Sequence, residues 1–409
     1  MQDNEKKPAL RFKGFTDPWE QRKLGDVADI VGGGTPSTNN PNYWDGDIDW
    51  YAPAEIAGQI YFDSSQRKIT EQGYENSSAK MLPPGTVLFT SRAGIGKTAI
   101  LSKKGCTNQG FQSIVPYNDE LDSYFVFSRT DELKQYGELV GAGSTFVEVS
   151  GKQMAAMNLK MPTTIEEQQT IGRFFKRLDT LITLHQRKYE KLVNIKKSML
   201  DKMFPKNGAS VPEIRFKGFT DPWEQRKLGE IAKEVVRNDP ASDAPIMMIT
   251  AGNGFIEQSD RYAFNNAGES LKKYILLERG ELAYNHGASK LRPYGSCFAL
   301  TTVEKARIPF VYHCFSVEKS NPEFLSIELN GANVENQLRK IVSSGARMDG
   351  LLNIAYSEYT EVTVQLPKKE EQDWIAKFFK HLDTLITLHQ RKLEKLQNIK
   401  KSCLEKMFV

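Results

Sequence analysis

The sequence predicts an α+β protein built as a tandem, pseudo-twofold duplication, in which two long helices pair as an antiparallel coiled coil. Residues 11–25 recur without change at residues 215–229. Residues 173–204 recur at residues 377–408 with 26 of 32 positions identical. Both pairs are offset by 204 residues, which divides the chain of 409 residues into two halves. Repetition at a fixed offset indicates two copies of one structural unit.

The repeats set the expected order of elements along the chain. We expect a first domain over residues 1–165, a long helix over 166–205, a linker over 206–214, a second domain over 215–369 and a second long helix over 370–409. The stretch from Pro205 to Pro212 is short and rich in residues that break regular structure, since it contains two prolines, a glycine and an asparagine.

The centres of the two halves differ in sequence although they have nearly the same length. Strand character is found at residues 86–90, 112–115, 308–312 and 362–366, where β-branched and aromatic residues gather. Equal size between shared ends predicts one α+β fold whose working surfaces have diverged toward different targets.

The repeated carboxyl segments have the periodicity of a coiled-coil seam. Acidic residues in the expected first turns suit the helix dipole, and a 4-3-4-3 spacing of apolar residues gives the 3.5-residue period. At about 1.5 Å per residue, each helix would be about 50 Å long or more. The predicted seam consists of Leu178, Ile182, His185, Tyr189, Leu192 and Met199 in the first helix and Leu382, Ile386, His389, Leu393, Leu396 and Cys403 in the second.

Two points about these helices stay open at the level of sequence. Leu181, Leu184 and Ile195 would widen the apolar stripe, and the alternative to a coiled coil is that each helix packs on its own domain. His185 and His389 occupy equivalent seam positions, where a polar residue can fix helix register; a pH switch is the alternative interpretation.

Composition excludes several classes of protein. Charged residues make up 26% of the chain and apolar residues 39%, as in soluble globular proteins, and no apolar run approaches the 18 or so residues of a membrane span. The polar amino end gives no sign of a secretory signal, and the four cysteines have no paired spacing. We therefore expect a cytoplasmic protein without structural zinc or disulfides.

Two stretches imitate catalytic motifs but depart from them. Residues 91–98 resemble a phosphate-binding P-loop, except that Ser91 replaces the first glycine, which such a loop needs in order to bend around phosphate. Residues 40–43 differ by Asn42 from the N-P-P-Y loop of adenine methyltransferases. No nucleophile elbow, HExxH or metal-ligand spacing is present, so the sequence predicts a protein that is not an enzyme and binds no metal.

The order of several short motifs resembles that of type I restriction–modification specificity subunits. The stretches that carry the resemblance are residues 19–25 with their copy at 223–229, 33–36, 43–44, 47–50, 91–97, 108–110, 345–353, and 366–367 before 370–372. One departure is that residues 143–150 stand where the second half has Gly345-Ala-Arg347-Met348, so an arginine contact is not carried over to the first half.

The resemblance implies a function and a set of partners. Such a subunit reads a bipartite double-stranded DNA target, with one half-site per target-recognition domain, and it holds two modification (methyltransferase) subunits together with restriction (translocase and nuclease) subunits. S-adenosylmethionine, ATP and Mg²⁺ would belong to those partners, so no cofactor is expected in this chain.

Polar side chains in the expected loops are the candidates for DNA contact, because base edges are read by hydrogen-bonding groups. In the first domain they are Tyr43, Ser91, Arg92, Lys97, Asn108, Gln109, Lys152 and Gln153. In the second domain they are Asn285, His286, Lys290, Arg292, Tyr294, Arg347 and Met348.

The distribution of charge argues against DNA binding by the isolated chain. The net charge of +4 hides a first centre, residues 26–165, with 11 basic and 16 acidic residues and hence a net charge of −5. The second centre, residues 230–369, has 16 basic and 17 acidic residues and a net charge of −1. An autonomous DNA-binding protein carries a basic face, so we expect the isolated chain to bind DNA weakly. A two-armed protein adaptor without DNA binding, and a P-loop ATPase with an altered loop, are the competing hypotheses.

Overall fold

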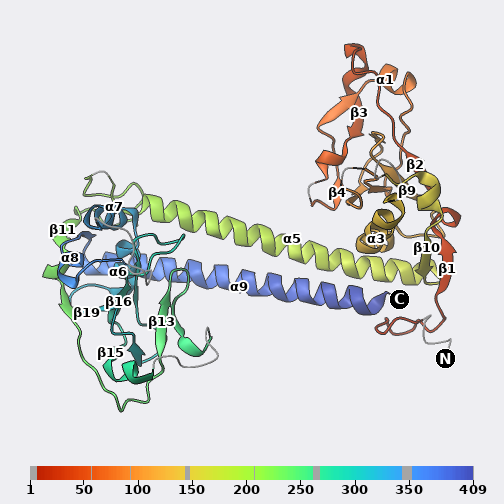
Figure 1. The fold of residues 1–409 in the computed structure, drawn as a ribbon. Coiled ribbons are helices and arrows are strands. Elements are labelled where there is room, and N and C mark those ends of the chain that lie inside the picture. Colours follow the sequence, from red (N-terminus) through yellow and green to blue (C-terminus); the bar gives the residue numbers. More distant parts are fainter. Residues whose placement is uncertain are drawn as a thin grey trace. The chain divides into compact units, whose positions relative to one another are not determined.

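A computed structural model describes residues 7–56, 58–92, 94–142, 148–206, 208–260, 268–342 and 352–408. The chain forms two compact units (Figure 1). The first unit contains Met1–Arg187 and Gln390–Val409, and the second contains Lys188–His389. Each unit therefore combines one domain with segments of both long helices.

The first unit is built on a five-stranded sheet with the order β2-β9-β6-β7-β4, which is antiparallel except for the parallel pair β4–β7. Its strands are β2 (Ala28–Gly32), β9 (Gln112–Pro116), β6 (Val87–Phe89), β7 (Thr98–Leu101) and β4 (Tyr61–Phe62). A second sheet has the order β5-β3-β8, and β1 pairs with β10. These strands are β5 (Arg67–Ile69), β3 (Trp44–Tyr51), β8 (Cys106–Thr107), β1 (Glu20–Lys23) and β10 (Asn158–Met161). The helices are α1 (Glu71–Glu75), α2 (Ser123–Phe127), α3 (Thr130–Gly141) and α4 (Gly151–Ala155).

The second unit is built on a four-stranded antiparallel sheet with the order β12-β19-β16-β17. Its strands are β12 (Ala232–Glu234), β19 (His313–Val317), β16 (Leu282–Asn285) and β17 (Ser296–Ala299). Three further antiparallel pairs are β13–β14, β15–β18 and β11–β20. These strands are β13 (Met247–Thr250), β14 (Gly254–Glu257), β15 (Ile275–Glu278), β18 (Lys305–Ile308), β11 (Glu224–Lys227) and β20 (Thr363–Leu366). The helices are α6 (Pro322–Leu329), α7 (Ala332–Ile341) and α8 (Tyr356–Tyr359).

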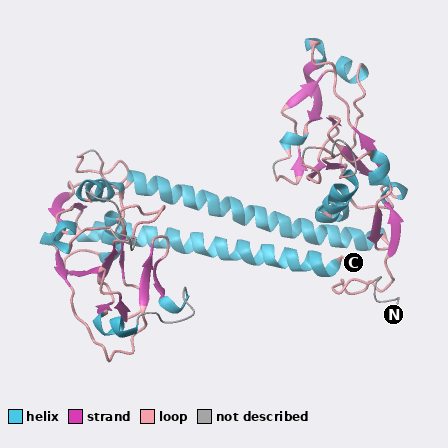
Figure 2. Ribbon diagram, viewed as in Figure 1, coloured by secondary structure: helices cyan, strands magenta, loops and turns pink. Residues whose placement is uncertain are grey.

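The two sheets share one topology, which confirms the predicted duplication of an α+β fold. The order β2-β9-β6-β7 in the first unit corresponds strand by strand to β12-β19-β16-β17 in the second. Both units combine strands with short helices (Figure 2). The flanking pairs also correspond, since Glu20 faces Met161 and Glu224 faces Leu366. The units differ most between β2 and β6 and between β12 and β16, where the sequences had diverged.

One predicted strand was wrong. Residues 308–312 do not form a strand: β18 ends at Ile308, β19 begins at His313, and the amide of Tyr312 donates to the carbonyl of Pro309 in a turn between them. Pro309 has no N–H to give to a ladder and therefore interrupts the β-branched run.

The long helices are α5 (Ile165–Lys202) and α9 (Lys369–Met407), and local sequence explains their ends. Glu166 and Glu167 lie in the first turn of α5, where carboxylates stabilise the positive end of the dipole. Gly172 is needed inside α5 because a Cβ there would come within 2.4 Å of Asp122 Oδ1 at the start of α2.

Within each unit the helices run antiparallel, as predicted. In the first unit, Phe175 of α5 stacks on Phe408, which follows α9, and Asp179 forms an ion pair with Lys400 at 2.5 Å. The residue number rises along one helix as it falls along the other. In the second unit, Lys196 pairs with Asp383 at 2.5 Å, and Phe204 after α5 lies against Phe379. The two contacts of the first unit therefore recur in the second unit between the residues that lie 204 positions away.

Burial along the helices follows the predicted seam in part. Leu178 and Leu382 are buried in the cores of their units. The remaining predicted seam positions are half-buried: Ile182, His185, Tyr189, Leu192, Met199, Ile386, His389, Leu393, Leu396 and Cys403. Leu181 and Leu184 do not widen the stripe, since they are 43% and 48% exposed, whereas Ile195 packs against the core of the second unit.

The repeated amino-terminal segments fasten each domain to the helices. The Arg11 guanidinium donates two 2.7 Å hydrogen bonds to the Glu167 carboxylate, and Arg215 donates two of the same length to Glu371. Such planar, two-point pairs have high geometric specificity. Identical repeats therefore serve the same assembly role in both units.

The same segments also reach the ends of the helices. The amide of Leu10 donates to the carbonyl of Lys406 at 2.8 Å, and the amide of Ile214 donates to the carbonyl of Lys202 at 2.9 Å.

Within the described ranges, no helix has the combination of length and apolar character that crossing a bilayer requires.

Candidate nucleic-acid interface

Loops from distant parts of the sequence converge at one edge of the sheet in the first unit. The amide of Ser91, after β6, donates to the carbonyl of Gly110, and the carbonyl of Ser91 accepts from the amide of Val149 at 3.0 Å. Gly33, after β2, lies so close to Asn108 that a Cβ would come within 2.0 Å of the Asn108 carbonyl oxygen. We call residues 90–97, 108–112 and 148–151 the first loop edge; residue 93 lies outside the described ranges.

The loop that imitates a P-loop closes on itself. Thr90 Oγ1 donates to the carbonyl of Gly94 at 2.7 Å and accepts from the amide of Lys97 at 2.9 Å, while the amide of Gly96 donates to the carbonyl of Thr90. A phosphate cradle needs backbone N–H groups turned toward the ligand, and here two of them bind Thr90. This geometry argues against the ATPase hypothesis.

The predicted contact residues of the first unit fall into exposed and structural groups. Lys97, Gln109 and Lys152 are exposed, and Arg92 is half exposed with its Nε 2.7 Å from Glu148 Oε1. Ser91 is fully buried.

Two of the amides in this set have structural bonds. Asn108 accepts from the amide of Gly110 in a tight turn, and Gln153 caps α4 through the amide of Ser150. Tyr43 lies apart from this edge, half-buried in the cluster around β3 and β5. The structure thus places Arg92, Lys97 and Gln109 on the first loop edge, and Lys152 directly follows its last segment.

The corresponding edge of the second unit lies after β16. Asn285 forms the same turn as Asn108, since its Oδ1 accepts from the amide of Gly287 at 2.9 Å. The carbonyl of His286 accepts from the amide of Leu352 at 2.9 Å, as the carbonyl of Ser91 accepts from Val149 in the first unit. We call residues 285–295, 311–313 and 352–355 the second loop edge.

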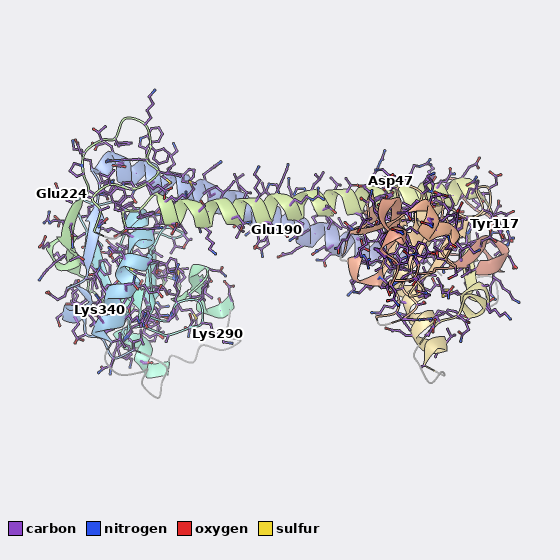
Figure 3. All side chains as sticks on the ribbon, turned by 90° about the horizontal axis from the view of Figure 1, so that it is seen from above. Asp47, Tyr117, Glu190, Glu224, Lys290 and Lys340 are labelled. Carbon is purple, nitrogen blue, oxygen red and sulfur yellow. The ribbon has the colours of Figure 1, made fainter. Side chains whose placement is uncertain are left out.

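The tip of the second loop edge is a tight turn that exposes two side chains. The amide of Ser289 donates to the carbonyl of Arg292, and Ser289 Oγ accepts from the amide of Arg292, both at 3.0 Å. Lys290 and Leu291 lie between them, and Leu291 is 65% exposed (Figure 3 labels Lys290). An apolar side chain held at such a tip can contact a thymine methyl group.

The other candidates of the second unit support this tip. Arg292 is half-buried, its Nη1 donates to the carbonyl of Asn330 at 2.6 Å, and burial lowers its pKa. The carbonyl of Tyr294 accepts from the Tyr284 hydroxyl. His286 is buried. For these side chains, as for Ser91, we expect a supporting role in place of base contact. Arg347 and Met348 lie outside the described residues.

Sequence reasoning overlooked several residues of these edges. Thr90 closes the first loop, Leu291 is exposed at the second tip, and His313 lies beside His286 with ring centroids 5.1 Å apart. Outside the two loop edges, the guanidinium carbon of Arg67 lies 3.7 Å from the centroid of the Trp44 ring, a cation–π contact on β5. A search limited to polar residues could not find Leu291, and the partners of Thr90 and His313 are set by the tertiary fold.

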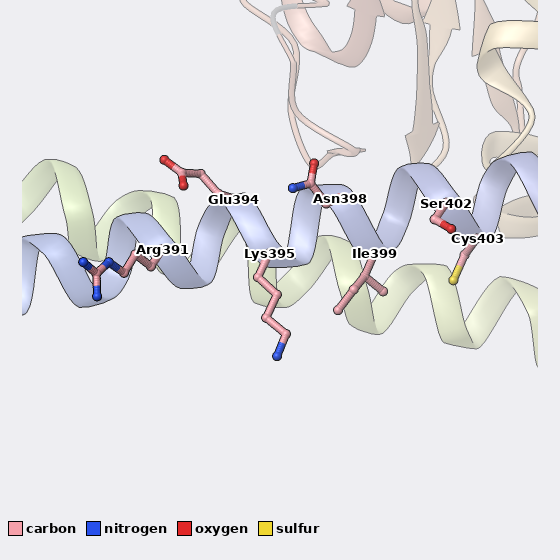
Figure 4. A pocket seen from close by; sticks show the side chains of 7 residues that line it. All are labelled: Arg391, Glu394, Lys395, Asn398, Ile399, Ser402 and Cys403. Carbon is pink, nitrogen blue, oxygen red and sulfur yellow. The ribbon is translucent and has the colours of Figure 1, made fainter. Parts of the chain in front are cut away.

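The described ranges contain no group of three or more His, Cys, Asp or Glu side chains that could hold a metal ion. Burial raises the pKa of the Cys106 and Cys297 thiols to about 12, which makes them poor nucleophiles. In the first unit, a shallow groove runs along α9, lined by Arg391, Glu394, Lys395, Asn398, Ile399, Ser402 and Cys403 (Figure 4). This groove mixes one acid with two bases on an open helix surface, and it differs in this respect from an enclosed catalytic pocket.

Comparison with known proteins finds a matching family model and similar sequences. Residues 16–194 match the family model described as the type I restriction modification DNA specificity domain. The chain is 34% identical over 224 residues to the type I restriction enzyme MjaIX specificity subunit of Methanocaldococcus jannaschii, covering 53% of this chain and 52% of that one. It is 28% identical over 200 residues to the EcoR124I/EcoR124II specificity subunit of Escherichia coli, covering 44% and 48%. The chain thus spans about half the length of the curated relatives it matches.

The fold is also similar to that of a type I restriction-modification S subunit from M. genitalium, whose crystal structure is known. The TM-score is 0.61 at 13% identity, and the match covers 98% of this chain and 99% of that one. At this level of identity the likeness shows the fold alone, and it extends over both halves.

Proposed function

We propose that this chain, whose residues 16–194 match the model of the type I restriction modification DNA specificity domain, is the DNA sequence-specificity subunit of a type I restriction–modification complex. In this role it reads a bipartite double-stranded DNA target, with one half-site for each loop edge. The chain performs no catalytic step and binds no cofactor itself; S-adenosylmethionine, ATP and Mg²⁺ belong to its partner subunits.

The observation that carries this proposal is one sheet topology with two different loop edges. The strands β2-β9-β6-β7 and β12-β19-β16-β17 have the same order, and Ser91 and His286 have equivalent backbone contacts. The side chains exposed beyond these contacts differ, with Lys97 and Gln109 in one unit and Lys290 and Leu291 in the other. A shared scaffold with unlike surface loops is the arrangement expected for two different half-sites.

The resemblance to specificity subunits supplies the proposed partners, and the charge of the chain supports them. The domain centres are net acidic, −5 and −1, so the chain has little of the phosphate attraction that dominates DNA affinity. Two modification subunits would supply much of the phosphate contact, and restriction subunits would join the same assembly. The two-armed adaptor without DNA binding is the alternative, and no feature of the loop edges favours it.

Mapping N6-methyladenine across the genome with and without this gene tests the proposal. We expect loss of one bipartite methylated motif when the gene is deleted and its return on complementation. An unchanged set of methylated motifs would refute the proposal and leave the adaptor.

Exchange of residues 26–161 provides a sharper version of the same experiment. Replacing them with the equivalent segment of another specificity subunit is expected to change one half-site and leave the other as it was. A change in both half-sites would contradict separate reading by the two units.

A further inference from the structure

The ring of His286 makes two contacts that a neutral imidazole cannot satisfy together. Its Nδ1 lies 2.9 Å from the carbonyl oxygen of Leu352, and its Nε2 lies 2.7 Å from the carbonyl oxygen of Val311. A carbonyl oxygen only accepts hydrogen bonds, and a neutral imidazole has one N–H donor. Both bonds therefore exist only when the ring carries a proton on each nitrogen.

The surroundings are consistent with an imidazolium at this position. His286 is 7% exposed, and a buried charge is tolerated when strong hydrogen bonds replace water. Two carbonyl dipoles supply such bonds. Burial, together with the neighbouring His286, holds the pKa of His313 below its usual range. His313 as a neutral ring can still donate from Nε2 to the carbonyl of Ile354 at 3.0 Å.

The titratable groups around the His286 ring come from four elements. His313 of β19 is the nearest, and Tyr284 of β16 lies 6.4 Å away between ring centroids. The Tyr356 ring of α8 lies 5.7 Å from the His313 ring between centroids, and Glu234 of β12 is a carboxylate close enough to act on Tyr356.

The bonds of His286 join three segments of the second loop edge. Residues 285–295 carry the exposed tip, Val311 belongs to the turn before β19, and Leu352 is the first described residue before α8. With the backbone bond from the amide of Leu352 to the carbonyl of His286, the contact between the first and last of these segments is doubled.

We propose that His286, as an imidazolium, is a positioning residue that clamps the tip of the second loop edge to the segment at Leu352 and so sets the geometry with which the second unit reads DNA. The inference rests on the proposed function for its DNA part, whereas the clamp itself is a property of the free chain. The first unit has no such clamp: Ser91 holds the equivalent position, and its hydroxyl is buried without a hydrogen-bond partner among the described residues.

The protonation state can be measured without any variant. The chain has five histidines, so nitrogen NMR of the full chain, labelled at the imidazole nitrogens, has only five rings to distinguish. At neutral pH we expect the spectrum to contain a ring with both nitrogens protonated whose signal is absent from the His286→Gln variant. Assignment of a neutral ring to His286 would overturn the proposal.

Hydrogen exchange of the full chain tests the clamp. In His286→Gln we expect the amides of residues 352–356 to exchange about tenfold faster, because one of the two carbonyls loses its donor. Residues 149–153 of the first unit are expected to stay unchanged. His381→Gln, at an exposed position of α9, is the matched control. Unchanged exchange at 352–356 would contradict the clamp even if the variant is well folded.

A selection from randomised duplex DNA, with the chain in complex with its co-expressed modification subunits, links the clamp to recognition. We expect His286→Gln to lose about tenfold in enrichment at one half-site and to keep the other within about twofold. Equal enrichment at both half-sites, with exchange at 352–356 accelerated, would refute the positioning role. Failure of the wild-type complex to select any sequence would refute the proposed function, and the NMR and exchange results would still decide the clamp.

Discussion

The reciprocal ion pairs between the long helices predict an unequal response to one substitution made at two equivalent places. Lys400→Met removes the partner of Asp179 in the first unit, and Lys196→Met removes the partner of Asp383 in the second. Both pairs have an N–O distance of 2.5 Å, so geometry does not distinguish them. Burial does, because the Asp179 side chain is 7% exposed and that of Asp383 is 53% exposed.

The magnitude follows from the environment of each carboxylate. Removing one partner of a fully buried pair costs about 3–5 kcal/mol, because a charge is left without compensation. Lys400 is 29% exposed and the Tyr124 hydroxyl still donates to Asp179 at 2.8 Å, so the expected cost is about 2 kcal/mol. Loss of an exposed pair costs about 0.2–1 kcal/mol. The difference corresponds to about tenfold in a local opening equilibrium.

Hydrogen exchange resolved by peptide measures this difference, since it reports each helix end separately and does not need two-state unfolding of the whole chain. We expect exchange over residues 396–406 to rise about thirtyfold in Lys400→Met and exchange over 192–202 to rise no more than about fivefold in Lys196→Met. Equal effects of the two substitutions would refute the argument from burial. A double-mutant cycle with Asp179→Asn then gives the coupling energy of the pair.

Three further outcomes are expected. Burial raises the pKa of Glu328 to about 7; because the folded chain holds this proton more tightly than the unfolded chain, stability falls as pH rises from about 4.5 to 7, by about 3 kcal/mol at most. Glu328→Gln should flatten that slope in urea melts at several pH values, and a slope that persists would exclude Glu328 as its source. Phe408→Ala removes a ring that contacts Phe175 and Trp19; it should destabilise the first unit by about 2–3 kcal/mol in thermal melts, whereas Leu388→Ala, at an exposed site, should cost less than about 0.5 kcal/mol. Finally, a circular permutant can join residues 409 and 1 through a copy of residues 205–212 and place its new ends within the original copy. Its free energy of unfolding should lie within about 1 kcal/mol of that of the wild type. Failure to fold would show that the linker in the second unit does more than connect.

Much of the architecture could be read from the sequence because duplication leaves a visible record. The offset of 204 residues predicted two copies of one fold, and the 4-3-4-3 spacing predicted paired helices. The strand predicted over residues 308–312 was wrong because its β-branched residues suggested a strand, whereas Pro309 has no N–H to donate to a ladder. The prediction that Leu181 and Leu184 widen the apolar stripe was wrong, because periodicity cannot tell a seam residue from an exposed neighbour when the partner helix is unknown.

The loop edges could be predicted as regions but less well as individual side chains. Lys97, Gln109, Lys152 and Lys290 are exposed where contact was expected. His286 is the counterexample, because its residue type suggests base contact but its ring is enclosed by carbonyl groups of residues 311 and 352. Those partners lie 25 and 66 residues away in sequence, and no local pattern indicates them.

The sequence by itself determined the duplication and the two long helices, and it indicated the resemblance to specificity subunits, because each depends on residue identity along the chain. Only the tertiary structure decided how the parts combine into compact units. The boundaries drawn from sequence assign the end of the second helix to the second half, yet Phe408 packs in the first unit against Phe175, and Phe204 packs in the second against Phe379. The physical reason is burial: the apolar end of each helix is covered by side chains of the other half, and such long-range contacts are set by the fold as a whole and are not encoded in any local stretch.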